Sequence, residues 1–135
     1  MIFVDSNIWC YYFDSSLKEH SAVSSKLNRI FKEESVAVNT LVMMEVSHYL
    51  IKHLGAVVGK EKADKMLQYP FVIVDFTYDM LMNSIGMLSR HSHTGIGGRD
   101  AIVLAAMEKL GCRKLITHDA AFKKIDEIDV IDPIM

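Results

Sequence analysis

Cysteine, proline and long apolar runs are scarce in this chain of 135 residues, which has two cysteines and two prolines. Cys10 and Cys112 lie far apart and form no CxxC pair, so the sequence predicts neither a disulfide framework nor a zinc site. A reducing cytoplasm is therefore the expected location. Asp5 interrupts the first apolar run, so we expect no secretory signal, and no run approaches the roughly 18 residues of a membrane span. We expect a soluble protein with no membrane partner.

The chain also lacks a strong charge of either sign. Its formal charge is −2, which is unusual for a protein that binds a polyanion through a lysine-rich face alone. Neutralising the four acids described below would change this charge to +2, so nucleic acid is not excluded as a partner. Half of the residues are hydrophobic, which suits one domain over residues 1–135 with a substantial core.

Short apolar strands alternate with helical segments along the chain, which predicts an α/β fold. The strands lack a polar face, as expected of a parallel sheet covered on both sides. We therefore expect a single-domain, three-layer α/β/α structure with a parallel five-stranded sheet. Gly111 marks the end of the last expected helix. The expected strands are 2–4, 36–38, 71–74, 115–117 and 130–131, and the expected helices are 21–34, 41–54, 60–68, 78–89 and 100–110.

Four carboxylates stand where a strand ends or the following helix begins. Asp5 and Asp119 end the first and fourth expected strands, while Glu45 and Asp100 lie near the starts of helices. The carboxyl ends of parallel strands share one edge of the sheet, where ligands bind, and neighbouring strands are about 4.8 Å apart. We expect the four acids to converge there and to hold a hard cation through their oxygens. Without metal they should repel one another, so Asp5→Asn is expected to stabilise the metal-free protein.

Each acid also has a simpler interpretation, as a turn residue or as a charge that stabilises a helix start. Asp75, Asp79 and Asp132 follow apolar strands too, and we interpret these three as turn and cap residues. Asp100 differs because it precedes the apolar run 101–107. A helix so apolar should be buried, and its acid then needs a partner, either a metal or Arg99.

Polar neighbours of the acids have two interpretations as well. Asn7 can donate a hydrogen bond that orients a metal ligand, or it can cap a helix that begins at Ile8. The Thr117 hydroxyl can hold an acid or a water, although strand threonines commonly just pack. His118 is expected to point elsewhere rather than to ligate metal.

Three other classes of protein share single features with this sequence. A phosphate-binding loop at 95–98 lacks the required lysine and spacing. A phosphoacceptor receiver domain needs a lysine at the end of a late strand, where this chain has Thr117-His-Asp119. A non-catalytic binding module stays open, although the presence of all four acids argues against it.

The segments that carry these residues resemble the four motifs of the PIN domain, particularly its small VapC-type toxins. The resemblance covers essentially the entire chain and implies the sheet order 3-2-1-4-5, a ribonuclease that depends on Mg²⁺ or Mn²⁺, frequent homodimers and an antitoxin protein encoded alongside. It implies that Asp5, Glu45, Asp100 and Asp119 are the catalytic, metal-binding acids, with Asn7 and Thr117 in support. Some members process RNA without being toxins. The matching segments are Asp5-Ser-Asn7, Glu45 after the second strand, Gly98-Arg-Asp100-Ala-Ile and Thr117-His-Asp119-Ala-Ala-Phe122.

The region 41–69 is richer in methionine, tyrosine and aliphatic side chains than one sheet face is expected to cover. Methionine and tyrosine are common at interfaces, so we expect a homodimer through this region, with burial inside the monomer as the alternative. The side chains concerned are Met43, Met44, Tyr49, Leu50, Leu54, Val57, Val58, Met66 and Tyr69.

Overall fold

A computed structural model describes residues 1–134 and contains a five-stranded sheet whose neighbouring strands are all parallel. The strand order is β3-β2-β1-β4-β5, so the expected fold class and the order implied by the resemblance are both confirmed. β1 is central and pairs with β2 on one side and β4 on the other. The strands are β1 (Ile2–Val4), β2 (Val36–Asn39), β3 (Val72–Val74), β4 (Lys114–Ile116) and β5 (Asp129–Ile131).

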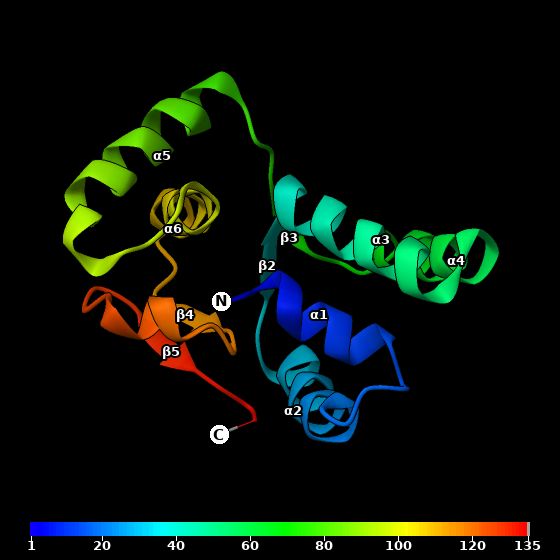
Figure 1. Ribbon diagram of the computed structural model, residues 1–135. Coiled ribbons are helices and arrows are strands. Elements are labelled where there is room, and N and C mark those ends of the chain that lie inside the picture. The colour runs from blue at the N-terminus through cyan, green and yellow to red at the C-terminus, as the bar shows by residue number, and fades with distance from the viewer. Residues whose placement is uncertain (135) are drawn as a thin grey trace.

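Helices cover both faces of the sheet. α1, α2, α3 and α4 lie on one side, and α5 and α6 lie on the other (Figure 1). The helix expected from residue 60 begins already at Ala56, because Gly55 turns the chain with a φ of 93° directly after the preceding helix. The helices are α1 (Ser6–Phe13), α2 (His20–Glu33), α3 (Thr40–Leu54), α4 (Ala56–Met66), α5 (Tyr78–Arg90) and α6 (Gly98–Leu110), with 3₁₀ turns η1 (Ser92–Thr94) and η2 (Ala120–Lys124).

The core is built from the central strands and from α6. Every residue of β1 and β2 is buried, whereas the edge strands β3 and β5 are partly exposed. α6 is the apolar helix that the sequence predicted, and six of its residues between Ala101 and Met107 are buried. It ends at Gly111, whose φ of 64° is the left-handed conformation that glycine adopts without strain.

An aromatic cluster fixes α1 against the sheet. The Trp9 side chain is fully buried, and its indole N–H donates to the Val4 carbonyl oxygen at 3.2 Å. Its ring centroid lies 5.0 Å from that of Phe71 and 6.0 Å from those of Phe13 and Phe31. Large buried rings contribute strongly to core packing. The cluster therefore holds α1 rigidly where it leaves the carboxyl end of β1.

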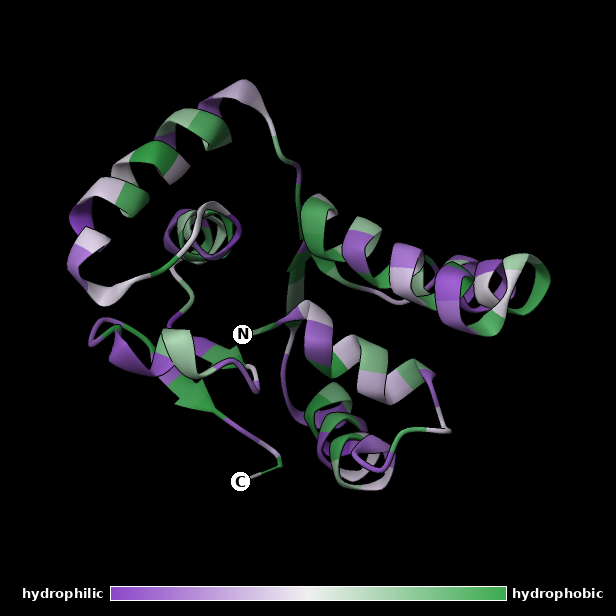
Figure 2. Ribbon diagram, viewed as in Figure 1, coloured by the Kyte–Doolittle hydropathy of each residue, from purple (hydrophilic) through white to green (hydrophobic). Residues whose placement is uncertain are grey.

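The apolar residues of region 41–69 divide between the core and the surface. Met43, Leu50 and Met66 are buried, so burial inside the monomer accounts for part of this set. Exposed members of the set are Met44, Val57 and Val58. A larger exposed apolar stripe lies on α5, where green bands recur along the helix (Figure 2). Among residues 1–134, no helix is long and apolar enough to cross a membrane.

Candidate metal centre

Three of the four predicted acids meet around the guanidinium of Arg99. Arg99 Nε donates to Glu45 Oε2 at 2.7 Å, and Nη1 donates to Asp100 Oδ1 at 3.2 Å. Nη2 donates to Asp5 Oδ1 and, at 2.7 Å, to the Ser6 hydroxyl. These residues come from α1, α3, α6 and the end of β1. One cation thus gathers carboxylates from three distant parts of the chain.

Asp5 is the fixed member of the group. Its side chain is fully buried, and it accepts hydrogen bonds from the Ser6 N–H at 2.7 Å and from the Thr117 hydroxyl at 2.8 Å. Asp5 is also the N-cap of α1. A buried carboxylate is costly without such partners, and these two donors hold it whether or not Arg99 is present.

Thr117 and Asn7 connect β4 to α1. The Thr117 hydroxyl accepts from Asn7 Nδ2 at 3.3 Å, and Asn7 Oδ1 accepts from the His118 N–H at 3.4 Å. Of the two interpretations of Asn7, the cap of a helix beginning at Ile8 is wrong, because α1 begins at Ser6 and Asp5 is the cap. Asn7 instead lies across the carboxyl end of the sheet.

Asp119 is connected to the other acids through Thr117. Its backbone N–H donates to the Thr117 hydroxyl at 3.0 Å, so Thr117 links it to Asp5. Its carboxylate caps η2 by accepting from the Ala121 N–H at 2.9 Å. Within residues 1–134 no hydrogen bond joins Asp119 directly to Asp5, Glu45 or Asp100.

Glu45 and Asp100 each keep one oxygen away from Arg99. Asp100 Oδ2 accepts from the Gly97 N–H at 3.2 Å at the start of α6. Glu45 Oε1 is buried and has no hydrogen-bond partner. An unpaired buried carboxylate oxygen is expensive, and a cation that reached it would remove that cost. For Asp100, Arg99 is the partner that the sequence offered as an alternative to metal.

The surroundings of Arg99 and its three acids carry a strong negative charge. Burial pushes the Arg99 pKa downward, but Asp5 and Glu45 outweigh burial and raise it above its usual value. Burial first, and then the charges of Glu45, Asp14 and Asp5, raise the pKa of the Cys10 thiol to about 12. One guanidinium faces three carboxylates, so negative charge remains in excess and favours a further cation or an exchange of cations.

The donor set suits Mg²⁺ or Mn²⁺, since both ions prefer carboxylate oxygens. Glu45 Oε1 supplies an oxygen that still lacks a partner. The arrangement is nevertheless spread around Arg99: no three His, Cys, Asp or Glu side chains in the described part of the chain form a ready cage for an ion. The guanidinium of Arg99 occupies the position that lies within reach of Asp5, Glu45 and Asp100.

The sequence had named Arg99 only as a possible partner of Asp100, and it had not indicated the Ser6 contact. The available signal was an arginine directly before an acid at the entrance of a buried helix.

His118, which was not expected to be a ligand, pairs with Asp132 at 2.9 Å. Asp132 accepts from the Ile134 N–H, as expected of a turn residue. Burial raises the Asp132 pKa, but these hydrogen bonds outweigh burial and lower it.

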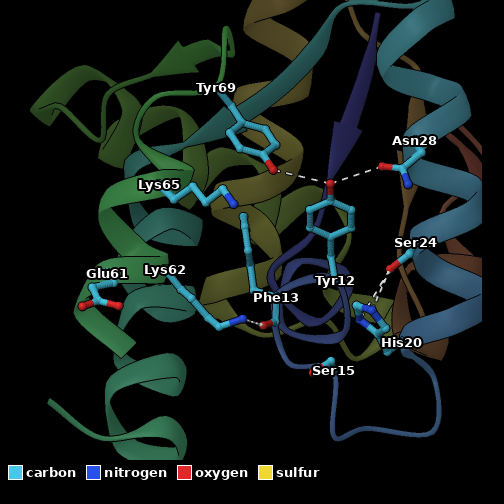
Figure 3. Close-up of a pocket in the computed structure, with 10 residues that line it drawn as sticks. All are labelled: Tyr12, Phe13, Ser15, His20, Ser24, Asn28, Glu61, Lys62, Lys65 and Tyr69. Carbon is cyan, nitrogen blue, oxygen red and sulfur yellow. Dashed lines mark hydrogen bonds between the residues drawn. The ribbon is translucent and has the colours of Figure 1, made fainter. Parts of the chain in front are cut away.

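A separate hollow of about 530 Å³ lies among α1, α2 and α4, and Figure 3 shows its lining. The Tyr12 hydroxyl donates to Asn28 Oδ1 at 3.2 Å and shares a 3.4 Å hydrogen bond with the Tyr69 hydroxyl. Lys62 Nζ donates to the Phe13 carbonyl oxygen at 2.9 Å. None of the predicted acids lines this hollow, so it is distinct from the acid group.

Matches to known proteins of similar sequence or structure cover nearly the whole chain. Ribonuclease VapC6 of Methanocaldococcus jannaschii is 23% identical, and the match covers 96% of this chain and 95% of that protein. VapBC2 from Rickettsia felis, solved with a DNA fragment from its promoter, has a TM-score of 0.76 at 19% identity and 98% coverage of both chains. VapC20 from Mycobacterium tuberculosis, a toxin that cleaves the sarcin-ricin loop, has a TM-score of 0.76 at 20% identity, covering 93% of this chain and 95% of that one.

A family model also matches most of the chain. The PIN domain model matches residues 2–128. That range includes all four acids and every helix of the described chain. The protein therefore belongs to the PIN domain family.

Proposed function

We propose that the protein is a metal-dependent endoribonuclease that hydrolyses RNA phosphodiester bonds. The observation that carries this proposal is the gathering of Asp5, Glu45 and Asp100 at the carboxyl end of the sheet, with Glu45 Oε1 buried and unpaired. Membership of the PIN family and the ribonuclease name of the archaeal relative support it.

Asp5, Glu45, Asp100 and Asp119 would hold Mg²⁺ or Mn²⁺ through carboxylate oxygens. Such a cation supplies an activated water and neutralises charge on the phosphate oxygens and the leaving oxygen. Asp5 is oriented by hydrogen bonds that do not depend on the cation, from Thr117 and from the α1 backbone.

Thr117 and Asn7 would act as supporting residues. Their mutual hydrogen bond fixes the end of β4 against the start of α1, so the distance between Asp5 and Asp119 is set by the fold. Hydrogen bonds of this kind to ligands typically affect metal affinity or activity by about 10- to 100-fold.

Cleavage of RNA by wild type and by Asp100→Asn tests the activity. The variant keeps the shape of the side chain but loses a charge, and we expect it to lose cleavage, as wild type should in EDTA. Asp79→Asn is the matched control, because Asp79 also lies in the first turn of a helix, α5, but is exposed and distant in sequence. Full activity of Asp100→Asn, or cleavage by wild type that survives EDTA, would reject the proposal.

We further propose that the nuclease is the toxin of a toxin-antitoxin pair. Among the similar structures is a toxin-antitoxin complex from Klebsiella pneumoniae, with a TM-score of 0.71 at 22% identity. An antitoxin would lay a segment over the acid edge and present a cationic side chain to it. Both proteins would meet in the cytoplasm, where Cys10 and Cys112 persist as free thiols. Harmless overexpression of the active nuclease, with no small protein co-purifying from its host, would contradict this role.

A homodimer is proposed as the assembled form, with α5 as its main face. Tyr78, Met82 and Ile85 are 74%, 57% and 60% exposed and recur at helical spacing on one side of α5. Leu81 and Leu88 extend the same stripe. Light scattering at micromolar concentration should give the dimer mass for wild type and the monomer mass for Ile85→Glu. A monomeric wild type would reject the proposed homodimer. A dimeric Ile85→Glu variant would indicate an interface on α3 and α4 instead.

A further inference from the structure

The oxygens that converge in the acid group all point at Arg99. Asp5 Oδ1, Glu45 Oε2 and Asp100 Oδ1 each accept a hydrogen bond from a different guanidinium nitrogen. A single ion that touched all three carboxylates through these oxygens would have to stand where the guanidinium stands. Arg99 and a shared metal therefore require the same space.

Charge leads to the same conclusion. Three carboxylates and one guanidinium leave a surplus of negative charge, which attracts a divalent cation. The guanidinium of Arg99 carries a full positive charge, because arginine does not lose its proton in proteins. Because the converging oxygens offer one position, a divalent ion that took that position would repel the guanidinium from it in this partly buried setting.

Arg99 is free to move toward solvent. Its side chain is 30% exposed and that of Glu45 is 32% exposed, whereas that of Asp5 is fully buried. The Thr117 hydroxyl and the Ser6 N–H hold Asp5, and the Gly97 N–H holds Asp100, without help from Arg99. Departure of the guanidinium into solvent would leave these two carboxylates in place.

We propose that Arg99 is an internal counter-ion that occupies the metal position in the metal-free protein and leaves it when Mg²⁺ or Mn²⁺ binds. In the metal-free protein, the positive charge of Arg99 thereby offsets the repulsion among the carboxylates. It also sets the metal concentration at which the site fills. This inference rests on the proposed metal-dependent function, and it concerns a residue that would hold neither metal nor substrate in the filled site.

NMR of the ¹⁵N-labelled protein tests the exchange directly. The Nε–H of Arg99, assigned by its loss in Arg99→Gln, should be protected from solvent exchange in EDTA because it donates to Glu45. Saturation with diamagnetic Mg²⁺ should abolish that protection. A protected Arg99 Nε–H at saturating Mg²⁺ would overturn the inference, since Arg99 would then still be seated among the acids.

Calorimetric titration with Mn²⁺ gives a second, independent measurement. Arg99→Gln should bind Mn²⁺ about ten-fold more tightly than wild type, a difference of about 1.4 kcal/mol, and should melt at a lower temperature in EDTA. Arg113→Gln is the matched control: it removes the same charge from an exposed arginine at the opposite end of β4 and should bind Mn²⁺ as wild type does. Equal or weaker binding by Arg99→Gln contradicts the exchange.

The two failures can be told apart. If wild type binds Mn²⁺ and cleaves RNA while the Arg99 signal stays protected, the inference fails and the proposed function stands. If wild type neither binds Mn²⁺ nor cleaves RNA, both are rejected.

Discussion

Two buried aspartates mark the two ends of α1, and they are satisfied in different ways. Asp5 caps the start of the helix and has a charged partner, Arg99, as well as neutral donors. Asp14 follows the end of the helix, and its carboxylate accepts from the Tyr49 hydroxyl at 2.7 Å and the Ser16 hydroxyl at 2.6 Å. Both carboxylates are nearly inaccessible to solvent. Burial alone therefore does not distinguish a functional acid from a structural one.

The kind of partner makes the difference. Neutral hydroxyl and backbone donors belong to the fold and cannot be exchanged, so they fix Asp14 permanently. Burial raises the Asp14 pKa, but hydrogen bonds from Ser16 and Tyr49 outweigh burial and lower it. The charge at Asp5 is balanced instead by a long, partly exposed side chain that another cation can replace. A buried acid whose counter-charge is movable is the better candidate for metal chemistry.

The largest expected contrast is in catalysis. Asp5→Asn should reduce RNA cleavage at saturating Mg²⁺ by at least about 100-fold, because the site loses a ligand charge. Asp14→Asn should cleave at nearly the wild-type rate at a temperature where it is folded. Initial rates on a fluorogenic RNA measure both. Equal losses in the two variants would mean that the two aspartates do not differ in role.

Metal-induced stabilisation should separate the same pair. At a free ion concentration a hundred-fold above the dissociation constant, binding stabilises the fold by about 2.7 kcal/mol. Thermal melting in EDTA and then in Mn²⁺ should show this shift for wild type and Asp14→Asn but not for Asp5→Asn. The stabilisation of metal-free Asp5→Asn that the sequence suggested is no longer expected, since Arg99 already offsets the repulsion. An undiminished Mn²⁺ shift in Asp5→Asn would place the ion elsewhere.

The smallest expected effect is on the structural side of the comparison. Tyr49→Phe removes one hydrogen bond to a buried carboxylate and should lower the free energy of unfolding by about 1.5–3 kcal/mol without changing metal binding. The folded-state pKa of Asp14 is lowered, so its contribution is present above the unfolded pKa of about 3.9 and is lost as pH falls through the folded value. Urea unfolding should therefore show the wild-type advantage at pH 7 and a reduced one below about pH 3.9. If the stability difference between wild type and Tyr49→Phe did not depend on pH, the Tyr49 hydroxyl would contribute through packing rather than through the Asp14 charge.

Local pattern was enough to predict most of the fold. Short apolar segments without a polar face indicated a parallel sheet, and that sheet brings the strand-end acids to one edge. Contacts between distant residues were beyond the reach of pattern, because they depend on how helices pack. The Tyr49 contact with Asp14 and the central position of Arg99 are of this kind. So is the close approach of α3 and α4 at Gly59, where a Cβ atom would overlap the Leu50 carbonyl oxygen.

The central position of β1 affects the order in which the site assembles during synthesis. β1 is the first strand to be synthesised, yet one of its two neighbours is β4, whose residues Lys114–Ile116 come near the end of the chain. Chains are made from the N-terminus at about 5–20 residues per second, and pairing between such distant segments closes late. Thr117, which orients Asp5, arrives with β4. A nascent chain therefore carries its first acid for most of its synthesis without a finished site, and the acids come together only when synthesis is nearly complete.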